Sequence, residues 1–217
     1  MSDLWMAEVV PYGWLHDAWV GEESFYPEEM PEEWRLDFFA NTFRSVCVPM
    51  TQWLSWAADL DETLDDLLES VVLDEDEAAF EKGDDAHLPF QFYFAVEKAL
   101  TGSQATLLQA IQQRLGRYAA GVVDLTQARS LGDGVWQQGK EGEEWLFGIY
   151  PLEIEEGKAQ AAWAETWLNR LKATLDIQQK RVPVIVGGER QQAHCQFKAP
   201  ERVQVAESLK IVMEMLG

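Results

Sequence analysis

Basic residues are scarce in this sequence, and their scarcity limits what the protein can bind. Seventeen lysines and arginines stand against 38 aspartates and glutamates, so the formal net charge is −21. Repulsion between like charges keeps such a chain in solution and opposes its approach to phosphate backbones and anionic lipid. The composition therefore predicts no nucleic-acid partner and leaves small molecules and other proteins as the expected ones.

Long apolar runs and cysteine are also lacking. No apolar run approaches the roughly 20 residues that span a bilayer, and no basic stretch followed by an apolar one opens the chain. Cysteine occurs only as Cys47 and Cys195, which are expected to be free thiols in a reducing compartment. We therefore expect a cytoplasmic protein that has no membrane partner.

The sequence lacks the common motifs of catalysis and cofactor binding. It has no Gly-x-Gly-x-x-Gly or lysine-containing phosphate loop, no Gly-x-Ser-x-Gly elbow and no metal-binding Cys-x-x-Cys or His-Glu-x-x-His spacing. The acidic run over residues 59–85 fails as an EF-hand, because the sixth position from Asp59 is Leu64 instead of glycine. We expect neither a cofactor nor a metal ion.

Apolar residues are plentiful, at 47% of the chain with 10 Trp and 10 Phe, so a sizeable core can form. Short apolar runs indicate buried strands at residues 7–10, 45–48, 90–96, 121–125 and 182–186, and a hairpin is predicted over residues 135–136 and 145–150. Helical periodicity is found over residues 32–42, 51–73, 103–118, 158–180 and 200–216. This alternation predicts one α/β domain over residues 1–217, with a mostly parallel sheet covered by helices.

Several short motifs are shared with a known family. They are Gly13-Trp14, Trp19-x-Gly21, Phe25-Tyr26-Pro27, Glu33-Trp34 and Phe43, with a strand-like Phe92–Lys98 and the final strand and helix. In these residues the chain resembles the YecE-like family, a domain of unknown function. The resemblance implies a TIM-type barrel, either complete or irregular with fewer than eight strand-helix units, and any ligand site at the C-terminal ends of its strands. It implies no settled activity.

The chain departs from this family where polar residues are expected. Val46-Cys47-Val48-Pro49 stands where the family has Val-Glu-Ile-Asn, and the family's strand lysine falls on Glu97, with Lys98 one residue late. A shift of one residue in a strand points a side chain to the opposite face. The comparison therefore predicts a protein that has lost the family's polar site and binds a small ligand or a protein partner.

Four aromatic residues near the end of the first predicted strand are candidate ligand contacts, namely Tyr12, Trp14, Trp19 and Tyr26. They could form an apolar wall whose indole and phenol groups supply hydrogen bonds. Alternatively they fill the mouth of the barrel as core, which is the commoner role of aromatic residues.

Charged candidates support an alternative hypothesis, an enzyme acting on a phosphorylated or otherwise anionic small molecule at the C-terminal rim. Lys98 or Arg190 would hold the anion, and His16 or His194 would act as acid and base. Gly187-Gly188 before Arg190 could offer backbone N–H groups to a phosphate, or could form only a tight turn. Cys47 and Cys195 would add a nucleophile or metal ligands only if they converge.

A third hypothesis concerns the predicted helix over residues 51–73. Its leucines form one stripe, and Asp61, Glu62, Asp65, Asp66 and Glu69 fall mostly on the opposite side. Such a helix is either a solvated surface or a face presented to a basic protein.

Overall fold

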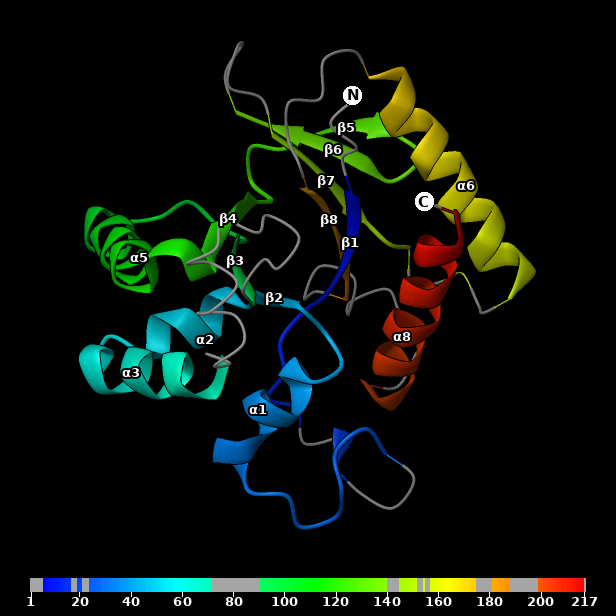
Figure 1. Ribbon diagram of the computed structural model, residues 1–217. Helices are drawn as coiled ribbons and strands as arrows, with labels where there is room; N and C mark the ends of the chain where they lie inside the picture. Colours follow the sequence, from blue (N-terminus) through cyan, green and yellow to red (C-terminus); the bar gives the residue numbers. More distant parts are fainter. Residues whose placement is uncertain are drawn as a thin grey trace, which may run out of the picture.

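The computed structural model describes most of the chain in nine ranges, namely residues 6–16, 19–20, 24–71, 90–139, 145–151, 154, 157–174, 181–187 and 199–216. The strands in these ranges are β1 (Met6–Pro11), β2 (Ser45–Val48), β3 (Gln91–Val96), β4 (Ala119–Asp124), β5 (Arg129–Gly132), β6 (Val135–Gln138), β7 (Trp145–Ile149) and β8 (Arg181–Val186). The α-helices are α1 (Arg35–Ala40), α2 (Met50–Ser55), α3 (Leu60–Val71), α5 (Gly102–Leu115), α6 (Lys158–Ala173) and α8 (Ala199–Leu216) (Figure 1).

The strands form two sheets that meet at β1 and β2. One sheet has the order β1-β8-β7-β6-β5, and the other has the order β2-β3-β4. Neighbouring strands run parallel in the second sheet and in the β1-β8-β7 part of the first. The N–H of Gly13 donates to the carbonyl of Cys47 at 2.9 Å, while the N–H of Tyr12 donates to the carbonyl of Val186 at 3.0 Å. The end of β1 therefore lies between β8 and β2.

The predicted TIM-type barrel is wrong. The described strands form two separate sheets, and β6 runs antiparallel to both of its neighbours, β5 and β7. A parallel crossover needs about a dozen or more residues, whereas only Asp133 and Gly134 connect β5 to β6. Both residues have positive φ, 55° and 78°, as a type I′ hairpin turn requires. This short connection replaces a strand-helix unit with a hairpin, so the regular alternation of a barrel stops after β4.

A side chain connects the outer strand of the smaller sheet to β6. The amide of Gln138 accepts a hydrogen bond from the N–H of Asp124 at 2.7 Å and donates one to the carbonyl of Val122. The Gln138 amide thus satisfies two backbone groups on the free edge of β4, where no backbone ladder continues among the described residues. Unpaired edge groups would otherwise need water or another chain.

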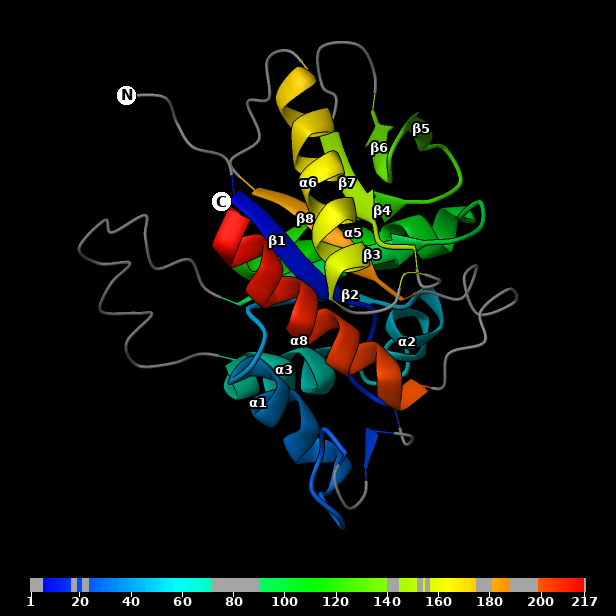
Figure 2. The same ribbon diagram turned by 90° about the vertical axis from the view of Figure 1, so that its right-hand side faces the viewer.

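The helices cover the outer faces of the sheets, and a smaller cluster lies inside. α6 and α8 lie along the β1–β8 side, while α2, α3 and α5 lie on the side of β3 and β4 (Figures 1 and 2). The larger apolar cluster fills the space between strands and helices. The inner cluster contains residues from β1, β2, β3, β4, β7 and β8 whose side chains face between the sheets. All four residues of β2 are buried, which explains why the three residues after Ser45 are all apolar.

The predicted helices are largely confirmed, with corrections to their bounds. The helix predicted over residues 158–180 ends at Ala173, and the one over residues 32–42 begins as the 3-10 helix Glu32–Trp34 and continues as α1. The single helix predicted over residues 51–73 is two helices, because the chain leaves helical geometry between Ser55 and Leu60. α5 begins one residue before Ser103, where Thr101 and Gln104 form a capping box.

Candidate functional site

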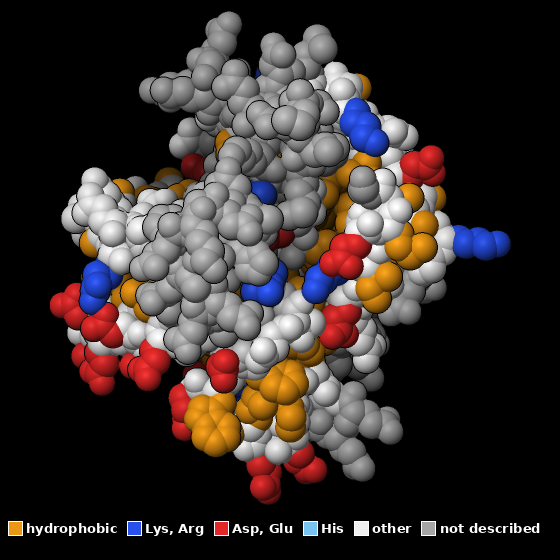
Figure 3. Space-filling model, in the orientation of Figure 1, with side chains coloured by type: hydrophobic (Ala, Val, Ile, Leu, Met, Phe, Trp, Pro, Cys, Tyr) orange, Lys and Arg blue, Asp and Glu red, His pale blue; other side chains and the backbone are white. Residues whose placement is uncertain are grey.

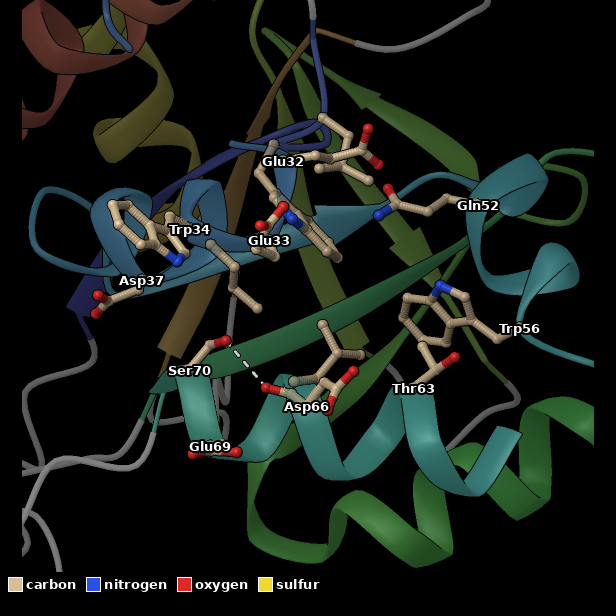
Figure 4. A pocket seen from close by; sticks show the side chains of 14 residues that line it. Glu32, Glu33, Trp34, Asp37, Gln52, Trp56, Thr63, Asp66, Glu69 and Ser70 are labelled. Atoms are coloured by element: carbon tan, nitrogen blue, oxygen red, sulfur yellow. Dashed lines mark hydrogen bonds between the residues drawn. The ribbon is translucent and has the colours of Figure 1, made fainter. Parts of the chain in front are cut away.

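A groove of about 830 Å³ lies between α3 and the segment that leads into α1. We call it the acidic groove. Its apolar lining includes Trp14, Leu36, Trp56 and Leu67. Its carboxylates are Glu32, Glu33, Asp37, Asp66 and Glu69 (Figure 4). Two stretches about 30 residues apart in the sequence therefore bring their acidic side chains to one cavity.

Amphipathic patterning places the acidic side chains of α3 in this groove. On α3, Leu64 and Val71 are buried in the core, whereas Asp66 and Glu69 are exposed on another face of the same helix. The Oγ of Ser70 donates to the backbone carbonyl of Asp66 at 2.9 Å. That bond leaves the Asp66 carboxylate uninvolved, so it is available to a ligand in the groove (Figure 4).

The opposite wall is the 3-10 helix Glu32–Trp34 together with the first turn of α1. Glu32, Glu33 and Asp37 are exposed on it. Trp34 is 63% exposed, an unusual environment for an indole in a chain that buries most of its large apolar side chains. In the space-filling view, acidic side chains gather over α3 and around α1 (Figure 3).

The charge of the groove is not balanced by its own lining, since no lysine or arginine lines it among the described residues. Arg35 follows Trp34 but is buried, with its guanidinium 5.9 Å from the ring centre of Tyr26. The cation of Arg114 pairs with Asp65, which does not line the groove. Unpaired carboxylates lining one cavity create a negative potential that attracts cations and repels anions.

One buried donor also lies in the groove. The Nε2 atom of Gln52 is inaccessible to solvent and has no hydrogen-bond partner among the described residues. Figure 4 shows its amide directed into the groove. A buried donor without a partner costs about 1–3 kcal/mol. A carbonyl oxygen of a ligand could remove that cost once the Gln52 side chain rotates to bring Nε2 into the groove.

A second, smaller cleft of about 320 Å³ lies at the ends of β1 and β2. Tyr12, Gly13, His16 and Pro49 line it, and Leu15 and Gln52 line both cavities. The Nε2 atom of His16 is 2.9 Å from the carbonyl oxygen of Tyr12. Since a carbonyl can only accept, Nε2 carries the proton in this contact.

The four candidate aromatic residues are mostly core. Tyr12, Trp14, Trp19 and Tyr26 are all buried, and the hydroxyl of Tyr26 donates to the carbonyl of Trp14 at 2.7 Å. Burial raises the pKa of Tyr26 well above its ordinary value, and the opposing effect of Arg35 is smaller. Of the four, Trp14 lines the acidic groove and Tyr12 lines the smaller cleft. The interpretation as core fits their burial.

The charged candidates do not form one site in the described part of the chain. Lys98 is exposed and lines neither cavity, whereas His16 lines the smaller cleft. The hydroxyl of Tyr12 donates a hydrogen bond to Glu97, the residue before Lys98. Arg190 and His194 lie outside the described residues, as do Gly188 and Cys195. An anion site built on Lys98 and His16 together therefore receives no support from their positions.

The described residues likewise form neither a nucleophilic site at Cys47 nor a cluster of metal ligands. Cys47 is completely buried, and this burial raises the pKa of its thiol well above the ordinary value. The protonated, inaccessible thiol is a poor nucleophile. No group of three or more potential metal-ligating side chains occurs within the described ranges. The described helices also include none that is long and apolar enough to cross a membrane.

The acidic groove could only partly be predicted from the sequence. The acidic face of the 51–73 segment was identified, but Glu32, Glu33 and Asp37 were not among the predicted site residues. Their spacing from Trp34 within one short helical segment was the available signal. No family model, no curated protein and no solved structure matches this chain. The resemblance to the YecE-like family thus stays a prediction.

Proposed function

We propose that this protein binds a basic segment of a partner protein in the acidic groove. The observation that carries the proposal is the set of five carboxylates that line one cavity of about 830 Å³ without a lining lysine or arginine among the described residues. Lysine and arginine side chains of the partner would pair with these carboxylates. The strong net charge of −21 would steer a basic partner toward the protein from a distance.

The unpaired amide of Gln52 favours a polypeptide over a simple polyamine as the occupant. A polyamine offers only donors, whereas a peptide offers main-chain carbonyl oxygens as well. After a side-chain rotation that brings it into the groove, Nε2 of Gln52 could donate to such a carbonyl while basic side chains meet the carboxylates nearby. The protein would then act as a binding protein rather than as an enzyme, in the cytoplasmic setting expected from its two cysteines.

A fluorescence anisotropy titration with a labelled nonapeptide that carries four arginines tests this proposal. We expect the double substitution Asp66→Asn and Glu69→Gln to weaken binding about three- to ten-fold at 50 mM NaCl, because each exposed charge pair contributes about 0.2–1 kcal/mol. Binding by the unaltered protein should also weaken as NaCl is raised to 500 mM, where the Debye length is only a few Å.

The matched control removes the same charge from exposed helix positions away from the groove, Glu165→Gln in α6 and Glu214→Gln in α8. This control should change peptide affinity by less than about two-fold, because distant exposed charges are screened. Equal weakening by both double substitutions would show that net charge, and not the groove, determines binding. Absence of peptide binding at 50 mM NaCl would refute the proposal.

A further inference from the structure

Trp34 is the feature of the acidic groove that charge alone does not explain. Its side chain is 63% exposed, although the same short segment buries Leu36 and Phe39 completely or nearly so. The described rings that cluster nearby, including Phe25, Phe38 and Phe39, pack against one another, and no described ring packs against Trp34. An exposed indole that lines a cavity is a common feature of recognition surfaces.

The residues next to Trp34 indicate which chemical group of a ligand could pack on its indole. Glu33 precedes it and Asp37 lies one helical turn later, and both line the same groove. In Figure 4 the indole and the Asp37 carboxylate extend from the same wall. An indole face attracts cations through its quadrupole, and planar guanidinium groups stack on it more often than ammonium groups do. A carboxylate beside the ring can accept two hydrogen bonds from the edge of the same guanidinium.

We infer that Trp34 makes the groove selective for arginine over lysine, with the guanidinium stacked on the indole and its edge on Asp37 or Glu33. This inference rests on the proposed function and adds the chemical class of side chain that the groove takes. The carboxylates attract either cation. The indole distinguishes them, because lysine presents a compact, strongly hydrated charge without a planar face.

Anisotropy titrations with two labelled nonapeptides test the inference, one carrying four arginines and the other four lysines at the same positions. At 150 mM NaCl we expect the arginine peptide to bind about two- to five-fold more tightly, the range typical of an exposed cation–π contact. Trp34→Ala should bring the ratio of the two affinities close to one and leave lysine-peptide binding nearly unchanged. Trp34→Phe should keep part of the preference, because an aromatic face remains.

Ile211→Ala is the control, since Ile211 is also largely exposed, at 58%, but lies on α8 away from the groove. It should leave the ratio unchanged. If both peptides bind and Trp34→Ala leaves their ratio unaltered, the inference is wrong while the proposed function stands. If neither peptide binds, both are wrong. Because Trp34 is exposed, its replacement should leave the thermal midpoint almost unchanged, which circular dichroism can check.

Discussion

Replacing Gly148 with alanine should destabilise the protein by about 1–3 kcal/mol or more, the usual cost of overpacking a core. Gly148 lies in β7 between Val135 of β6 and Val184 of β8. A Cβ atom there would be 2.8 Å from Nε1 of Trp167, closer than real side chains approach. Trp167 is fully buried and its ring lies 6.0 Å from that of Trp163, so it has little room to move. Chemical denaturation measures the effect.

The control for this substitution is Gly102→Ala at the start of α5. A Cβ added at Gly102 meets no atom within 4 Å, and alanine restricts the unfolded chain more than glycine does. We expect an unchanged or slightly higher stability, by up to about 1 kcal/mol. An equal loss in both variants would mean that the close contact between β7 and α6 does not limit side-chain size at position 148.

Removing Arg181 should have the largest effect on stability. Its guanidinium is 2.8 Å from a carboxylate oxygen of Glu8, and the side chains of Arg181 and Glu8 are only 16% and 9% exposed. The hydroxyl of Tyr93 donates to the other carboxylate oxygen at 3.2 Å. With methionine at position 181, Glu8 would be a buried charge without its cation. We expect a loss of about 3–5 kcal/mol, the usual cost of breaking such a pair.

The double substitution Glu8→Gln and Arg181→Met separates the lone charge from the loss of packing. Without a carboxylate to neutralise, the double variant should recover most of the stability that Arg181→Met loses. Urea denaturation of the two single variants and the double variant gives the coupling energy. A loss of less than about 1 kcal/mol of unfolding free energy in Arg181→Met would show that water solvates the Glu8 carboxylate or that another group pairs with it.

The existence of most strands and helices could be predicted, because burial leaves a local pattern. β2, β3 and β8 are buried on both faces and are apolar after their first residues, Ser45, Gln91 and Arg181. Which strands pair with one another leaves a weaker pattern in the sequence. The prediction of a barrel therefore rests on the resemblance to the YecE-like family. The dipeptide Asp133-Gly134 was the available signal against it, since this pair favours a type I′ turn and hence the hairpin of β5 and β6.

The candidate site was harder to predict for two physical reasons. The carboxylates of the two walls are about 30 residues apart, and nothing local in the sequence indicates that α3 faces the start of α1. In the sequence, Trp34 also continues the helical spacing of Phe38 and Phe39, which predicts a buried indole. In the structure it is the last residue of a 3-10 helix and the N-cap of α1, ahead of the first turn of that helix. Its indole lies outside the buried stripe of α1 and is 63% exposed.

The location of a bound basic peptide is the most direct test of the acidic groove as a binding site. We would titrate ¹⁵N-labelled protein with the four-arginine nonapeptide at 50 mM NaCl and follow backbone amide and indole signals by NMR. If the peptide binds in the acidic groove, the largest shifts will occur at the indole N–H of Trp34 and at residues 32–37 and 63–70. Shifts that spread evenly over the acidic surface, or that centre on α6 or α8, would contradict it.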